Sequence, residues 1–263
     1  MQLNYHLQGA SDQNNTPVVL LHGLFGSLEN LNVIARPLQQ HTQVLAIDLP
    51  NHGRSPHCDT LDYPMMAEQV LALLNQLKFD KVNLLGHSMG AKVAMHLALN
   101  HHDKVEKLIV ADMAPVQYSP KHNDVLDALN AIDLTTVKTR KQADEQLAQY
   151  IEELGVRQFL LKSLAPNSDK TDDKNAMQWR FNLKAISENY QALTLGFDEH
   201  LQYKGPTLFI KGELSGYIQA KHRPTIAKLF PNSRGHVVND AGHWLHAQKP
   251  EQFNRIVNGF FLA

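Results

Sequence analysis

One serine, flanked by glycines, has the clearest potential for covalent chemistry in this chain. The stretch Gly86-His87-Ser88-Met89-Gly90 follows an apolar run and precedes a segment rich in small residues. The two glycines allow a sharp strand-to-helix turn that exposes the serine hydroxyl. A glycine-flanked serine also occurs in ordinary turns, so the flanking strand and helix patterns carry the argument. We expect Ser88 to be a nucleophile that attacks an acyl carbon.

A serine nucleophile needs a base, and the 15 histidines of the chain supply the candidates. His243 lies in "NDAGHWLHAQKP", far downstream of Ser88 and just before the last helical pattern. A histidine base that follows the nucleophile in the chain is the order found when the serine lies on a turn between a strand and a helix. His246 falls too far into the next segment, and His236 lies within a strand pattern. His87 is fixed by the turn that carries Ser88, which indicates a role in packing or in supporting the residues that contact the substrate.

Two backbone amides are candidates for stabilising the negative charge that develops on the attacked oxygen. The Met89 N–H begins the helix after Ser88, where the helix dipole favours an anion. The Leu24 N–H lies in a loop in which Gly23 and Gly26 permit unusual backbone dihedrals. We expect these two amides to form an oxyanion hole, although such glycines also suit a plain strand-helix turn.

The carboxylate that would orient His243 is missing from the usual place in the chain. The stretch "FIKGELSGYI" holds Ser215 at that position, and a serine carries no charge. Asp112 ends the strand expected next to the nucleophile strand, so its carboxylate is able to reach the same histidine. Glu213 is the alternative, but it falls earlier in its loop. Asp48 ends another strand, and we expect it to organise its own loop.

Short apolar runs alternate with longer segments of helical period, which is the pattern of a parallel sheet covered by helices on both faces. We expect the Tyr5 region to add an antiparallel edge strand, and "KPEQFNRIVNGFF" predicts a final helix against the sheet. The fold class expected is α/β, with these strands: 18–23, 43–49, 81–87, 106–112, 206–212 and 234–240.

The strand pattern stops between about residues 116 and 204. That stretch contains four segments of helical period, separated by polar turns such as "APNSDKTDD" at 165–173. We expect a helical lid at 116–204, inserted between the two parts of the core at 1–115 and 205–263.

The composition points to a small, largely uncharged partner. The 263 residues include 25 Lys and Arg against 26 Asp and Glu, so no net charge recruits nucleic acid. The apolar runs are too short for a membrane span, and the beginning lacks a signal-peptide pattern. The single cysteine, Cys58, fits a reducing compartment, so we expect a cytoplasmic protein. The scattered histidines predict no metal site, and the chemistry requires no cofactor.

Four motifs resemble those of the α/β-hydrolase fold family. They are "HGLFGS", "DLPNHGRSP", "GHSMGAK" and "AGHWLHAQKP". The resemblance as a whole covers about residues 1–115 and 205–263. The combination of "DMAP" at 112–115 with "GELSGY" is similar to the YbfF-type bacterial esterases and their mitochondrial relatives. That resemblance implies Asp112 as the acid of a Ser–acid–His triad, and a structural role for Asp48.

The expected activity is hydrolysis of short-to-medium acyl esters. Phe25, Met113, Trp179 and Trp244 are the candidates for an apolar substrate pocket, although Trp179 also suits the interior of the lid. Acyl thioesters react by the same route, and a basic group in the lid such as Arg180 or Lys184 would favour a charged carrier. Carbon–carbon hydrolases and lyases of the fold keep the same serine triad. A small-molecule receptor on a hydrolase fold is the alternative outside enzymes.

Overall fold

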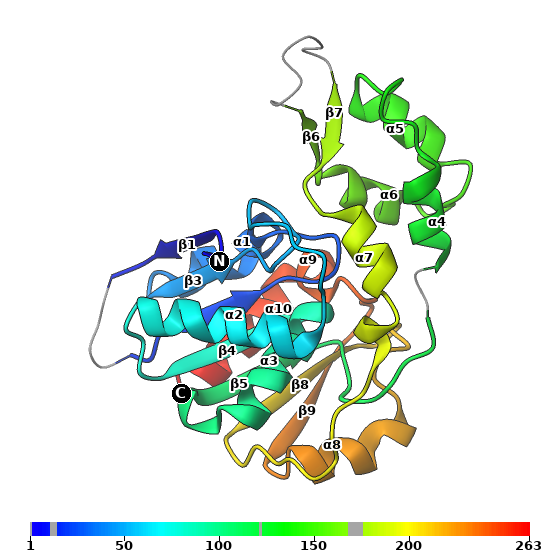
Figure 1. Cartoon of the computed structure of the whole chain (residues 1–263). Helices are drawn as coiled ribbons and strands as arrows, with labels where there is room; N and C mark the ends of the chain where they lie inside the picture. Colours follow the sequence, from blue (N-terminus) through cyan, green and yellow to red (C-terminus); the bar gives the residue numbers. More distant parts are fainter. Residues whose placement is uncertain (1, 11–14, 121–122, 168–175) are drawn as a thin grey trace.

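The architecture is a seven-stranded sheet covered by helices on both faces (Figure 1). The computed structural model describes residues 2–10, 15–120, 123–167 and 176–263. Within these ranges the strand order is β1-β3-β2-β4-β5-β8-β9, and all neighbours are parallel except β1 and β3. The strands are Tyr5–Gln8 (β1), Val18–Leu21 (β2), Val44–Ile47 (β3), Val82–His87 (β4), Val105–Ala111 (β5), Thr207–Gly212 (β8) and Ser233–Val238 (β9).

The central strands are apolar because both of their faces are buried. In β2 the side chains of Val19 and Leu21 face one apolar core, and those of Val18 and Leu20 face the other. This alternation follows from the period of two in a strand. The fold class and the strand positions predicted from the sequence are confirmed, with ends that shift by one to two residues.

One face of the sheet is covered by α2, α3 and α8, and the opposite face by α1, α9 and α10. Asp62 caps α2 by accepting a hydrogen bond from the Met65 N–H, and Pro64 lies in the first turn, where its missing N–H costs no hydrogen bond. In α10, Phe253 and Val257 are fully buried against the sheet. The bounds are Asn32–Leu38 (α1), Tyr63–Gln76 (α2), Met89–Asn100 (α3), Arg223–Leu229 (α8), Leu245–Gln248 (α9) and Pro250–Phe261 (α10).

Between β5 and β8 the chain forms a separate group of elements at one end of the sheet (Figure 1). They are Asn123–Ala131 (α4), Arg140–Leu147 (α5), Leu154–Leu161 (α6), Leu164–Pro166 (β6), Met177–Trp179 (β7) and Leu183–Asn189 (α7). Their apolar side chains continue the core formed by α2 and α3. This group is called the inserted segment below.

The inserted segment is not entirely helical, which corrects the sequence prediction. Residues 164–166 and 177–179 pair as an antiparallel hairpin. One of the four segments of helical period, residues 177–193, resembles a single helix in sequence because its apolar spacing continues across a boundary at Asn182. The Asn182 side chain accepts a hydrogen bond from the Ala185 N–H and begins α7 there. Most of the expected polar turn at 165–173 lies outside the described residues.

None of the helices in the described ranges combines the length and the apolar character that crossing a membrane requires.

Candidate active site

Ser88 occupies a strained turn between β4 and α3. Its backbone has φ 55° and ψ −117°, a conformation that side-chain-bearing residues rarely adopt. A Cβ added at Gly86 would lie 2.2 Å from the Gly90 carbonyl oxygen, and one added at Gly90 would lie 2.3 Å from the Leu21 carbonyl oxygen. Both glycines are therefore required for this turn, which presents Ser88 at the carboxyl edge of the sheet.

Ser88, His243 and Asp112 form a continuous chain of hydrogen bonds. The His243 Nδ1 lies 2.7 Å from the Asp112 Oδ2, and the His243 Nε2 lies 2.9 Å from the Ser88 Oγ. A carboxylate only accepts hydrogen bonds. In the neutral imidazole, Nδ1 therefore carries the hydrogen and donates a hydrogen bond to Asp112. The Nε2 then accepts from the Ser88 hydroxyl. This is the arrangement that a serine nucleophile and its base need.

The Asp112 carboxylate is fully buried and is held by donors from the neighbouring strand. Its Oδ1 accepts a hydrogen bond of 3.1 Å from the Gly212 N–H, and its Oδ2 also accepts from the Ser215 hydroxyl. The parallel register pairs Ala111 with Ile210, so β5 and β8 end side by side. Hydrogen bonds from three donors offset the cost of burying this charge.

The alternative acid, Glu213, does not reach His243. Its side chain is exposed, and its Oε2 accepts a hydrogen bond of 2.9 Å from the Asp240 N–H. The structure thus brings Asp112 to the histidine and leaves Glu213 on the surface of its loop.

Two neighbouring rings contact His243. The Tyr217 ring stacks on the imidazole with centroids 4.1 Å apart, and the His87 ring lies with its centroid 4.8 Å away. The His87 Nε2–H also donates a hydrogen bond of 2.8 Å to the His243 carbonyl oxygen. Burial lowers the pKa of His87 well below its ordinary value and that of His246 to about 4. Both neighbours are therefore neutral near pH 7 and add no positive charge beside His243.

The loop after β2 fixes the orientation of the Leu24 amide. The Leu49 N–H donates to the His22 Nε2, so the His22 Nδ1 carries the proton and donates to the Gly23 carbonyl oxygen at 2.8 Å. The Gly26 N–H donates to the same oxygen. A trans peptide points its N–H opposite to its carbonyl. The Leu24 N–H therefore points away from His22.

Asp48 organises the loop after β3. Its Oδ1 accepts from the Leu28 N–H at 2.7 Å, and its Oδ2 accepts from the Arg54 N–H at 2.9 Å. Gly53 has φ +60°, and a Cβ there would lie 2.2 Å from the Asp48 Cγ. The carboxylate is thus used by the backbone around it.

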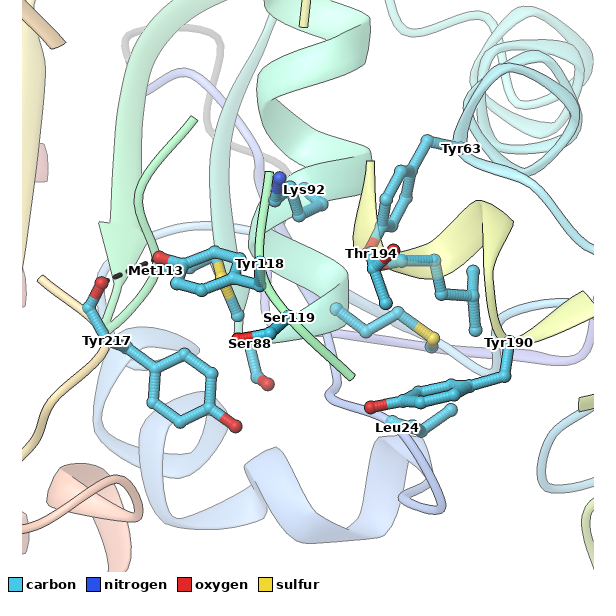
Figure 2. Close-up of a pocket in the computed structure, with 12 residues that line it drawn as sticks. Leu24, Tyr63, Ser88, Lys92, Met113, Tyr118, Ser119, Tyr190, Thr194 and Tyr217 are labelled. Atoms are coloured by element: carbon cyan, nitrogen blue, oxygen red, sulfur yellow. Dashed lines mark hydrogen bonds between the residues drawn. The ribbon is translucent and has the colours of Figure 1, made fainter. Parts of the chain in front are cut away.

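Two cavities meet at Ser88. The narrow cavity has a volume of about 40 Å³, and the wide cavity has a volume of about 230 Å³. Ser88, Leu24 and Tyr217 line both. Figure 2 shows the narrow cavity, where Tyr118 and Tyr190 lie around Ser88. The wide cavity is mainly apolar, with walls from Val125, Val156, Phe159 and Leu160.

The predicted pocket residues divide between these two cavities. Phe25 and Trp244 line the wide cavity, and Met113 lines the narrow one together with Met89. Among the described residues, the linings of both cavities omit Trp179, whose buried ring stacks on Phe181 with centroids 5.2 Å apart.

Sequence reasoning missed the polar wall of the narrow cavity. This wall consists of tyrosines from separate parts of the chain and a buried lysine: Tyr63, Tyr118, Tyr190, Tyr217 and Lys92. Their positions in the sequence share no local spacing. Lys92, one helical turn after Ser88, and Tyr217, at the end of "GELSGY", lie within motifs that the sequence analysis singled out, but for other residues.

No three His, Cys, Asp or Glu side chains in the described parts of the chain come together as metal ligands.

The fold and this site define the class of protein. Residues 16–250 match the model of the alpha/beta hydrolase fold family, and the chain belongs to that family. Esterase YbfF of Escherichia coli K12 is 38% identical over 262 residues, which are 99% of each chain. The sn-1-specific diacylglycerol lipase ABHD11 of Mus musculus is 37% identical over 99% of this chain and 85% of its own.

A solved structure is also similar over the whole length. A marine microorganism esterase superposes with a TM-score of 0.92 at 39% identity and covers 98% of this chain and 99% of its own. The resemblance to the YbfF-type esterases is therefore confirmed, and the chain is a hydrolase.

Proposed function

We propose that this hydrolase cleaves carboxylic esters of short-to-medium acyl groups through an acyl-enzyme on Ser88. The observation that carries the proposal is the hydrogen-bonded chain from Asp112 through His243 to Ser88, with two cavities that meet at the serine. The esterase and lipase activities named for its relatives support an ester substrate.

In the proposed mechanism, His243 takes the Ser88 proton as the Oγ attacks the ester carbonyl carbon. The oxygen of the tetrahedral intermediate accepts hydrogen bonds from the Leu24 and Met89 amides. Asp112 stabilises the imidazolium that forms. His243 then gives its proton to the leaving alcohol, and a water molecule repeats the sequence to release the acid. No metal or organic cofactor takes part in these steps.

The position of His243 orients the substrate between the two cavities. The leaving oxygen must lie near the His243 Nε2 because this nitrogen protonates it. His243 and Trp244 line the wide cavity, which therefore receives the alcohol. The acyl group extends into the narrow cavity beside Met89 and Met113. A volume of about 40 Å³ there favours short acyl chains.

A charged thioester carrier receives less support from the structure. The basic residues that would favour it both have acidic partners on this chain. The Arg180 Nη1 lies 3.5 Å from the Glu29 Oε2, and the Lys184 Nζ lies 4.0 Å from the Glu188 Oε1. The ester is therefore the substrate class that we propose.

Covalent labelling tests the role of Ser88. A fluorophosphonate should add one label per chain in the wild type and none in Ser88→Ala, as measured by intact mass. The same variant should lose about 10⁶-fold in kcat toward p-nitrophenyl butyrate, because the nucleophile is removed. Ser187→Ala is the matched control, since that hydroxyl contacts Asn130 rather than a histidine. Labelling that persists in Ser88→Ala would exclude Ser88 as the nucleophile.

A further inference from the structure

Lys92 is a buried lysine on the helix that begins directly after Ser88. Lys92 lies one turn beyond Ser88, between the fully buried Ala91 and Val93, and is itself only 1% exposed. Lysine is almost never buried to this extent without partners. The side chain lines the narrow cavity but is not required by the proposed mechanism.

The partners of Lys92 are two backbone carbonyls from distant parts of the chain. Its Nζ donates to the Val116 oxygen at 2.6 Å and to the Leu195 oxygen at 2.7 Å. Val116 lies where the chain leaves β5 for the inserted segment, and Leu195 lies where it returns toward β8. These two stretches of chain, residues 116–118 on the way out and residues 193–197 on the way back, are called the outgoing and returning passes. They are also joined directly, because the Tyr118 N–H donates to the Thr194 carbonyl oxygen at 2.9 Å.

The surroundings of the Lys92 Nζ are aromatic. The ring centroids of Phe197, Tyr118 and Tyr63 lie 5.0, 5.4 and 5.7 Å from it. Burial lowers the pKa of Lys92 to about 7. A neutral amine still has two N–H groups, so it is able to donate to both carbonyls in either charge state.

The two passes that Lys92 joins are also walls of the narrow cavity. Tyr118 comes from the outgoing pass, and Leu193 and Thr194 come from the returning one. Figure 2 shows the Lys92 side chain between the segments that carry Tyr118 and Thr194. The Tyr63 hydroxyl adds a hydrogen bond of 2.6 Å to the Leu193 carbonyl oxygen. A change at the Lys92 Nζ therefore acts on both walls at once.

We propose that Lys92 is a positioning residue. It fixes both ends of the inserted segment against α3, the helix that follows Ser88, and so sets the width of the narrow cavity. Its effect on acyl-chain preference rests on the proposed ester hydrolysis. Its effect on the two passes is independent of the proposed function, because it depends only on the hydrogen bonds to the Val116 and Leu195 carbonyls.

The decisive variant is Lys92→Met, which keeps a long apolar side chain and removes the donor. An apolar residue in place of a buried charged group often leaves a protein equally or more stable. We expect an unchanged or higher Tm. Hydrogen exchange should become at least about tenfold faster at residues 116–118 and 193–197, where the hydrogen bonds are lost. The ratio of kcat/KM for p-nitrophenyl butyrate to that for the octanoate ester should fall about tenfold, as the cavity widens.

The matched control is Lys107→Met. The Lys107 Nζ also donates to backbone carbonyls, those of Phe260 and Phe261, but these lie at the end of α10. This control should leave both the exchange at the two passes and the ester ratio unchanged.

A folded Lys92→Met variant with wild-type exchange at both passes and a wild-type ester ratio would overturn the proposal. If the wild type hydrolyses neither ester, the proposed function fails, and hydrogen exchange alone decides the role of Lys92. If Lys92→Met does not fold, Lys92→Gln replaces it. Its shorter amide does not serve both carbonyls, so exchange at one pass or both should still accelerate, and unchanged exchange there would overturn the proposal.

Discussion

The parallel strands β5 and β8 end side by side at the same edge of the sheet, but one end carries a hydrogen-bond acceptor and the other carries donors. The first presents a buried acceptor, the Asp112 carboxylate. The last residue of β8 and the loop after it present two donors to this carboxylate, the Gly212 N–H and the Ser215 hydroxyl, and the loop's own carboxylate, Glu213, is exposed. The acid of such a site is therefore located by where the surrounding donors converge, rather than by which loop usually carries it.

Asp112→Asn should break this arrangement most strongly. An asparagine leaves the shape but no longer holds His243 in the required tautomer or stabilises the imidazolium, so kcat/KM for p-nitrophenyl butyrate should fall about 10⁴-fold. Circular dichroism should show a wild-type fold. Activity within tenfold of wild type would mean that His243 takes its acid from elsewhere.

Moving the carboxylate to the other loop should recover part of this loss. In Asp112→Asn with Ser215→Asp, the new carboxylate lies on the loop whose hydroxyl now contacts the Asp112 Oδ2. We expect kcat/KM to rise about 100-fold above that of Asp112→Asn, because an anion again faces His243. The recovery stays partial because the Gly212 N–H is placed for the original carboxylate. No recovery at all would show that the two loops are not interchangeable.

Ser215→Ala should have a smaller effect. It removes one of the three donors to the Asp112 carboxylate, and one such hydrogen bond corresponds to roughly 1.4 kcal/mol, or about tenfold in kcat/KM. Glu213→Gln is its control on the same loop, and we expect its kcat/KM to stay within about twofold of wild type. A larger loss in Glu213→Gln than in Ser215→Ala would reverse the comparison between these two side chains.

Much of the fold was predictable because its signals are local. The apolar runs that became β2, β3, β4 and β5 are continuous in sequence, and the period of the flanking helices is visible in the same way. The β6–β7 hairpin was not predictable, because its paired stretches are only three residues long. Such a pair is too short to show a period of its own.

The site was predictable to the extent that topology could be inferred. Ser88 was predicted from the strand, turn and helix around it. Asp112 was favoured over Glu213 by the expected order of neighbouring strands and by the family resemblance. The hydroxyl of Ser215 beside Asp112 did not follow, because the sequence indicated only that a serine cannot replace an acid. The partners of Lys92 come from two distant segments, and no local pattern indicates that they meet.

The location of Asp112 has a consequence for how this chain tolerates change. Ser88 and Asp112 both belong to a single strand-helix-strand unit, β4–α3–β5, whereas His243 lies 155 residues beyond Ser88. The inserted segment therefore follows Ser88 and Asp112 in the chain and does not separate them. Insertions or deletions within the inserted segment do not interrupt the β4–α3–β5 unit, so the inserted segment has freedom to diverge in length and to acquire new specificities.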